Sequence, residues 1–166
     1  MSLLLPMQKE DRWPDFTPPL RRDYRAVTVA DFCTAALTNW LIPSLIEKMI
    51  RGDRPQTTSG RQLADYLFID DVGQAVLSVA EHAAAQGIFN LGSGRPVSVR
   101  TIVETIRNII APDMNLVFGE VPHSANQVWH MEADITRLTS LTGFSPSVSI
   151  DEGLRLTADW HKARLP

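Results

Sequence analysis

The sequence predicts an α/β fold, on three observations. Short apolar runs of four to six residues alternate with longer segments in which apolar residues recur every three or four positions. This alternation is typical of strands followed by helices. Two of the longer segments start after a serine placed to cap a helix. The length of 166 residues and the hydrophobic fraction of 44% suit a soluble domain with a sizeable core.

The chain divides near residue 40. Residues 1–40 include the stretch DRWPDFTPPLRRDYR, which contains three prolines and no clean hydrophobic period. Proline opposes regular structure, so we expect an irregular segment, in which residues 29–40 are a candidate short helix. The regular pattern occupies residues 41–166, which we treat as the folded α/β domain.

The first elements of that domain follow from apolar spacing. Residues 41–51 place their apolar side chains on one helical face, which predicts a helix. The run YLFI, residues 66–69, predicts a buried strand. Asp70 and Asp71 are then expected to cap a helix over residues 72–85. Acid–base catalysis by this carboxylate pair is the less favoured alternative.

The next elements continue the alternation. GIFNLG, residues 87–92, predicts a second buried strand, and MNLVFG, residues 114–119, a third. Between them, Ser98 is placed to cap a helix over residues 99–110.

Two helices are predicted near the end of the chain. The segment DITRLTSLTGF indicates a short helix that ends near Gly143. The last helix is expected to start at Ser149, because Glu152 follows it with the spacing of a capping box.

Composition excludes several classes of function. The net charge of −3 and the pI of about 5.8 give no basic surplus for gripping nucleic acid. No apolar run approaches the ~20 residues that span a bilayer. The single cysteine, Cys33, excludes an internal disulfide and fits a core position better than a nucleophile. We therefore expect a cytoplasmic protein that binds neither nucleic acid nor membranes.

The glycine-rich stretch GIFNLGSGRPVSV, residues 87–99, has two interpretations. A dinucleotide-binding loop needs G-x-G-x-x-G between a strand and a helix. Gly92 and Gly94 supply two glycines, but no third follows at the required place. A structural turn with a positive φ is favoured. The predicted strand before the loop leaves the phosphate-binding alternative open.

Side chains suited to catalysis or metal binding form no recognisable pattern. The four histidines do not show helix-face spacing, so we expect no metal site. His123 and His130 flank a polar segment, where they are either ligand contacts or ordinary surface residues. No G-x-S-x-G and no Tyr-x-x-x-Lys pattern is present. These residues alone indicate no self-contained catalytic site.

Four segments in order nevertheless resemble a known family. The segments are LIPSLIEKMIRGD, GRQLADYLFIDDVGQAV, GIFNLGSGRPVSVRTIV and VWHMEADITRLTSLTGFSPSVSIDEGLRLTADW. Together they resemble the C-terminal part of NAD-dependent sugar-nucleotide epimerases and dehydratases, the extended short-chain dehydrogenases/reductases. The resemblance covers about three quarters of the chain.

This resemblance implies a substrate-binding lobe without a complete Rossmann domain. In the family, the NLGSG segment is a structural turn, and the NAD-binding glycine loop and catalytic Tyr-x-x-x-Lys precede the region that starts here at Leu41. Residues 1–40 contain neither. We therefore expect no catalytic and no cofactor-binding residue in this chain, and no turnover by the chain alone. It would be a truncated product, a separate domain, or one piece of a split enzyme whose NAD-binding part is another chain.

The alternative is a non-catalytic interaction or scaffold protein that kept the fold and lost the ligand. Two departures from the family favour it. Where family members usually carry phosphate-binding arginines, this chain has Ala64 and Ser124. Arg61 or Arg95 would have to replace them.

The resemblance also implies the partners and the candidate site. The expected ligand is a nucleotide-diphosphate sugar between the strand near Tyr66 and residues 122–127. The strand and helix that pack against the family's NAD-binding domain would expose apolar surface here, which predicts self-association. The candidate substrate-binding residues are Arg61, Gln62, Tyr66, His123, Ser124 and Gln127.

Overall fold

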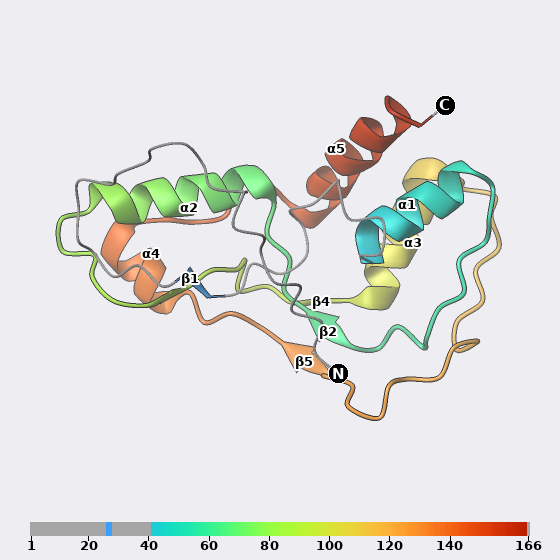
Figure 1. The fold of residues 1–166 in the computed structure, drawn as a ribbon, viewed down its shortest axis with the longest axis horizontal. Coiled ribbons are helices and arrows are strands. Elements are labelled where there is room, and N and C mark those ends of the chain that lie inside the picture. Colours follow the sequence, from blue (N-terminus) through green and yellow to red (C-terminus); the bar gives the residue numbers. More distant parts are fainter. Residues whose placement is uncertain (1–25, 28–40, 166) are drawn as a thin grey trace, which may run out of the picture.

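The helices gather into two groups at opposite ends of an elongated molecule (Figure 1). The computed structural model describes residues 26–27 and 41–165. One group contains α1 (Leu41–Ile50), α3 (Val99–Ile110) and α5 (Ile150–Lys162). The other contains α2 (Ile69–Glu81) and α4 (Thr136–Thr142).

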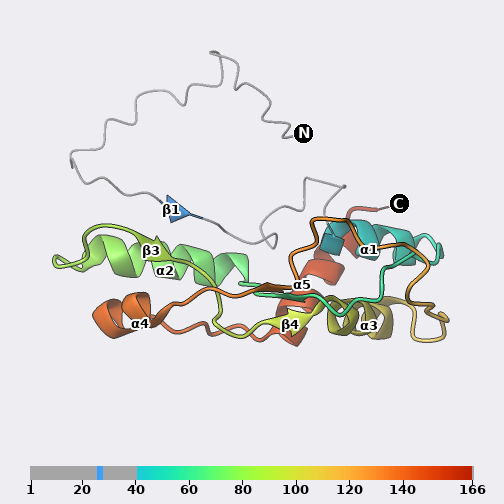
Figure 2. The same ribbon diagram turned by 90° about the horizontal axis from the view of Figure 1, so that it is seen from below.

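Short strands lie between and beside these groups. β2 (Leu63–Ala64) is central in a three-stranded sheet, antiparallel to β4 (Val97–Ser98) and parallel to β5 (His130–Met131). β1 (Ala26–Val27) pairs in parallel with β3 (Phe89–Asn90). Seen from below, β4 lies between the α2–α4 end and the α1–α3 end (Figure 2).

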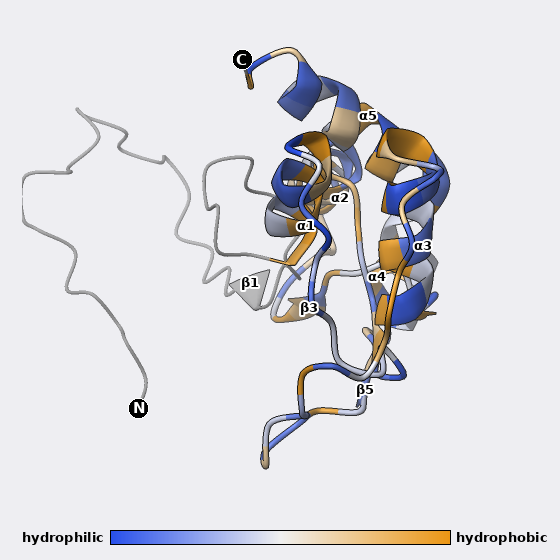
Figure 3. Ribbon diagram, turned by 90° about the vertical axis from the view of Figure 1, so that its right-hand side faces the viewer, coloured by the Kyte–Doolittle hydropathy of each residue, from blue (hydrophilic) through white to orange (hydrophobic). Residues whose placement is uncertain are grey.

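Each helix group has its own hydrophobic core, because each helix is amphipathic. Figure 3 shows hydrophobic and hydrophilic residues alternating along α1, α3 and α5. Each of these helices contributes a fully buried side chain to a single hydrophobic cluster: Ile46, Ile102 and Leu154. The smaller core at the other end is built from Leu67, Ala75, Leu138 and Phe144.

The predicted helix ends in the second half of the chain are confirmed. The Ser98 hydroxyl accepts a hydrogen bond from the backbone N–H of Thr101 at 3.0 Å. The Ser149 hydroxyl accepts one from the N–H of Glu152 at 3.2 Å. The Glu152 carboxylate pairs with Arg155 instead of returning to Ser149, so the capping box is only half formed.

Two predicted strands are wrong. The predicted strand over residues 66–69 does not form, and α2 already begins at Ile69. Residues 114–119 contribute only an isolated bridge between Thr57 and Phe118. In both cases part of the apolar run packs against a core, which does not require strand pairing, while Ile69 and Val117 remain exposed.

The segment before residue 41 is described only at β1, which lies where we expected no regular structure. The candidate helix over residues 29–40 lies outside the described residues. None of the helices in the described part of the chain has the length and apolarity needed to cross a bilayer.

Candidate functional site

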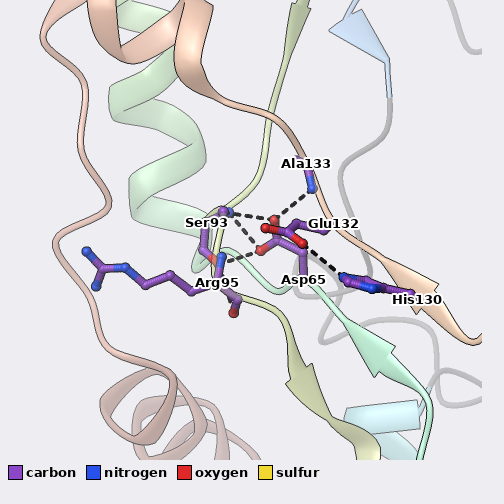
Figure 4. Close-up of polar contacts among 7 residues, drawn as sticks. Asp65, Ser93, Arg95, His130, Glu132 and Ala133 are labelled. Atoms are coloured by element: carbon purple, nitrogen blue, oxygen red, sulfur yellow. Dashed lines mark hydrogen bonds and ion pairs between the residues drawn. The ribbon is translucent and has the colours of Figure 1, made fainter.

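A buried carboxylate holds the glycine-rich loop. Asp65 directly follows β2 and is 4% exposed. It accepts hydrogen bonds from the backbone N–H groups of Ser93 (2.8 Å), Gly94 (2.9 Å) and Ala133 (3.1 Å). The Ser93 hydroxyl also donates to it. Figure 4 shows these donors converging on the carboxylate from the loop and from the segment after β5. We call these four residues the Asp65 cluster.

The two glycines of this loop are required for different reasons. Gly92 is buried so closely that an added Cβ would lie 2.4 Å from the Ala133 Cβ and 2.6 Å from an Asp65 oxygen. Gly94 has a φ of 66°, which side-chain-bearing residues rarely adopt. The loop directs its N–H groups at the carboxylate of Asp65. In the described part of the chain, this loop therefore acts as a structural turn.

A second buried carboxylate fixes the segment before α5. Asp71 is 1% exposed and accepts hydrogen bonds from the N–H and hydroxyl of Ser147 (3.1 and 2.7 Å) and from the N–H of Val148 (3.0 Å). Burial raises the pKa of Asp71, but these hydrogen bonds outweigh that effect, and the net pKa lies below its ordinary value.

The expectation that Asp70 and Asp71 cap α2 is wrong. Phe68 occupies the N-cap position and provides no side-chain cap, and both aspartates lie in the first helical turn. There they suit the positive end of the helix dipole. The carboxylate of Asp71 instead accepts hydrogen bonds from Ser147 and Val148, which lie 76 and 77 residues further along the chain.

Gln62 and His123 both contact the segment before β2. The Gln62 amide donates to the Thr58 hydroxyl at 3.3 Å. The His123 Nε2 lies 2.8 Å from the Ser59 hydroxyl. Gln62 Oε1 and His123 Nδ1 are both buried and have no hydrogen-bond partner among the described residues. Unpaired buried polar atoms are costly, so these two atoms are suited to accept a ligand's contacts.

Trp129 adds an aromatic surface beside His123. The two rings are 4.6 Å apart between centroids and tilted by 49°. Trp129 is 52% exposed, and its carbonyl accepts the N–H of Leu63 at 2.9 Å, which ties the residue to β2. Trp129 is not among the residues predicted from the sequence, although an aromatic residue next to a candidate ligand segment was an available signal.

Gln127, Ser124 and Arg61 lie nearer the surface. The Gln127 amide donates to the neighbouring Val128 carbonyl at 2.7 Å. Ser124 is exposed, and its hydroxyl accepts the N–H of Asn126 at 3.3 Å. Arg61 is exposed, and none of the described residues forms a hydrogen bond or ion pair with its guanidinium that would restrain it.

Tyr66 lies apart from these residues in the wall of a cavity. The side chain is 8% exposed and belongs to the α1–α3–α5 core. The cavity has a volume of about 310 Å³, and its walls contain none of the other five candidate residues. Its lining is Tyr66, Phe68, Ser93, Arg95, Val97, Pro146, Ser147, Val148, Ser149 and Ile150.

Metal ligands do not cluster in the described part of the chain: no group of three His, Cys, Asp or Glu side chains is placed to hold an ion. The one His–carboxylate pair near the candidate site joins His130 Nε2 and Glu132 at 2.9 Å (Figure 4). Both side chains are half exposed, which suits a surface pair.

Curated relatives match the chain in part. No family model matches the sequence. The UDP-glucuronate 4-epimerase of Thermodesulfobacterium geofontis is 29% identical over 108 residues, which are 64% of this chain and 32% of that protein. The dTDP-4-dehydro-6-deoxyglucose reductase of Escherichia coli is 30% identical over 117 residues, 69% of this chain and 36% of that protein. The chain spans about a third of the length of these relatives.

Solved structures show the same partial likeness. The UDP-glucose 4-epimerase of Thermotoga maritima, solved with UDP-glucose, has a TM-score of 0.68 and 26% identity, over 86% of this chain and 44% of that one. The Bordetella bronchiseptica enzyme WbmF, in complex with NAD+ and UDP, has a TM-score of 0.62 and 28% identity, over 74% and 36%. These matches confirm the predicted α/β fold. They also show that this chain matches less than half of each solved chain.

Proposed function

This chain is related to the C-terminal part of NAD-dependent sugar-nucleotide epimerases and dehydratases of the extended short-chain dehydrogenase/reductase family, and we propose that residues 41–166 form a substrate-binding lobe. Its ligand would be a nucleotide-diphosphate sugar. The proposal is carried by two buried atoms that have no hydrogen-bond partner in the described part of the chain, Gln62 Oε1 and His123 Nδ1, together with the exposed Trp129 ring beside His123.

Each side chain of this site has a chemical role in the proposal. Trp129 and His123 offer flat faces on which a base or sugar ring packs. Gln62 and Gln127 provide amide groups for sugar or base hydroxyls and carbonyls. Arg61 is the nearby cation whose guanidinium has no partner among the described residues, and a guanidinium fork suits a diphosphate.

We further propose that the chain alone performs no hydride transfer. The sequence contains neither G-x-G-x-x-G nor Tyr-x-x-x-Lys. The NLGSG loop does not fit NAD, because its N–H groups already bind Asp65, whose negative charge would repel a phosphate. NAD would supply the hydride chemistry only from a binding domain outside these residues.

The interaction-protein alternative is favoured by Ala64 and Ser124, which stand where the family carries arginines. Ala64 contacts the α1–α3–α5 core and Ser124 is exposed. Self-association is proposed for the substrate-binding lobe as well, because the surface that packs against the family's NAD-binding domain would be uncovered here. The side chains of Val76, Leu77 and Ile88 are each more than half exposed, at 56%, 52% and 54%, which is apolar surface suited to a second copy.

Calorimetric titration distinguishes the two functions. We expect weak UDP-glucose binding by the parent and no NAD binding. The Ala64→Arg, Ser124→Arg double variant should bind UDP-glucose at least tenfold more tightly, about 1.4 kcal/mol. Inorganic pyrophosphate is the control for unspecific attraction. Ser124→Arg alone is the companion variant, because Ala64 contacts the core. If neither variant prefers UDP-glucose over pyrophosphate, the substrate-lobe proposal fails and the interaction function is favoured.

A further inference from the structure

The cavity beside Tyr66 is a second candidate binding site, and its walls are mostly apolar. Its volume of about 310 Å³ is at the lower end of the range for small-molecule sites. Two aromatic side chains, Tyr66 and Phe68, line one part, and Val97, Val148 and Ile150 contribute aliphatic surface. Such walls favour a flat, apolar ligand body.

Arg95 is the charged residue in this lining. Its backbone N–H donates to the Ser93 hydroxyl at 3.1 Å, which holds the residue at the rim. Figure 4 shows its side chain extending away from the Asp65 carboxylate. No hydrogen bond or ion pair occupies the Arg95 guanidinium within the described residues. It is therefore free to form a charge-assisted fork with an oxyanion.

The serines of the wall differ in what they can offer. The Ser93 and Ser147 hydroxyls donate to Asp65 and Asp71. The Ser149 hydroxyl accepts from the N–H of Glu152 and retains its proton for a ligand. Among the described residues of the lining, Arg95 thus offers a cation and Ser149 a hydroxyl donor to an incoming oxygen.

The two buried carboxylates limit the charge that the cavity tolerates. Asp65 accepts a hydrogen bond from the wall residue Ser93, and Asp71 accepts one from the wall residue Ser147. Each carboxylate is satisfied by several donors, but its charge still opposes a nearby anion. With these two carboxylates nearby, the single positive charge of Arg95 offsets the charge of a monoanion better than the charge of a dianion.

We propose that this cavity binds a small organic monoanion in which one carboxylate is joined to a flat apolar ring. The Arg95 guanidinium and the Ser149 hydroxyl hold the carboxylate, and the ring packs against Tyr66 and Phe68. This site goes beyond the proposed sugar-nucleotide function and does not depend on it.

Benzoate titrated into the ¹⁵N-labelled full chain tests the proposal. We expect the amide signals of Ser147, Val148 and Ser149 to shift in a saturable way. Benzamide, which is neutral and of the same shape, should bind at least tenfold more weakly. Acetate, which lacks the ring, should also bind at least tenfold more weakly. Equal binding of benzoate and benzamide, or shifts that avoid these three residues, would overturn the proposal.

Variants of two arginines provide the matched comparison. Arg95→Gln should weaken benzoate binding at least tenfold, and Arg95→Lys should weaken it less, because the charge remains and the fork is lost. Arg61→Gln removes an exposed arginine outside the cavity and should leave benzoate binding unchanged. Unchanged binding by Arg95→Gln, or a loss shared with Arg61→Gln, contradicts the assignment.

A competition arm separates this proposal from the sugar-nucleotide proposal. Excess UDP-glucose should leave the benzoate-induced shifts in place, whether or not it binds elsewhere. Arg61→Gln should weaken UDP-glucose binding alone. Benzoate binding without UDP-glucose binding supports the cavity and defeats the substrate lobe. Displacement of benzoate by UDP-glucose defeats the separate cavity.

Discussion

The Asp65 carboxylate accepts a hydrogen bond from the backbone N–H of Ala133, 68 residues further along the chain, at 3.1 Å. The same carboxylate binds the N–H groups of Ser93 and Gly94. It thereby joins the end of β2, the loop between β3 and β4, and the segment between β5 and α4. These three segments connect the two helix groups, so the Asp65 cluster fixes the junction between two separate cores.

Asp65→Asn should destabilise the protein by about 3 kcal/mol. The amide keeps one acceptor oxygen but turns its NH₂ group toward N–H donors, which leaves buried donors unpaired at about 1–3 kcal/mol each. Urea unfolding followed by circular dichroism measures the loss. Asp70→Asn is the control, because Asp70 is the exposed neighbour of the buried Asp71. Equal losses in the two variants would refute a special role for Asp65.

Gly92→Ala and Gly73→Ala should change stability in opposite directions. At Gly92 the new Cβ would lie 2.4 Å from the Ala133 Cβ, and overpacking of this kind costs about 1–3 kcal/mol. Gly73 lies in α2 with nothing within 4 Å of the added atom, so alanine should gain about 0.5–1 kcal/mol through helix propensity. Thermal midpoints check both signs. A neutral Gly92→Ala would mean that the loop does not approach Ala133 this closely.

Sequence patterns predicted the local features of this fold well. Ser98, Ser149 and Gly143 mark helix ends, and the structure places the helix ends there. Caps and helical spacing depend on residues within a few positions of one another. The turn at Gly94 and the helix positions were therefore available from the sequence, except that α2 spans Ile69–Glu81 instead of the predicted residues 72–85.

The long-range features were not available in this way. The strands β2, β4 and β5 are two residues long, too short for a period to emerge. The roles of Asp65 and Asp71 depend on donors from distant segments, so adjacency in the sequence misassigned Asp71 to a cap. The resemblance groups Tyr66 with His123, but the structure places Tyr66 in the core and in the wall of a cavity whose lining does not include His123.

Stability should fall as the pH is lowered through about 6.5, because of His161. This residue is 2% exposed. Burial lowers the pKa of its imidazole, Glu47 opposes the shift and Arg164 adds to it. A depressed folded-state pKa means that the unfolded chain takes up the proton first. The stabilisation is therefore complete above the unfolded pKa of about 6.5 and is lost as the pH falls toward the folded value.

His161→Gln should flatten this dependence. Urea unfolding of the parent and the variant between pH 5 and pH 8 gives the comparison, and this range stays above the acid region in which the carboxylate of Asp71 is protonated. The buried Nε2 of His161 has no hydrogen-bond partner in the described region, so the variant loses no contact at that atom. Parallel pH profiles for the two proteins would exclude His161 as the cause.

Leu77→Glu should reduce self-association without lowering stability. Val76 and Leu77 follow Ile69 by seven and eight residues along α2, which brings all three to one side of the helix. Their exposed fractions are 44% for Ile69, 56% for Val76 and 52% for Leu77. Burying this face against a second copy would remove apolar surface from water, and a carboxylate at its centre would oppose that burial. Sedimentation velocity at tens of micromolar should show a concentration-dependent oligomer for the parent and a monomer for Leu77→Glu. Asn108→Glu adds the same charge at an exposed position of α3, in the other helix group, so it separates a local effect from general charge repulsion. A monomeric parent, or equal dissociation by both variants, would show that this face of α2 does not drive association.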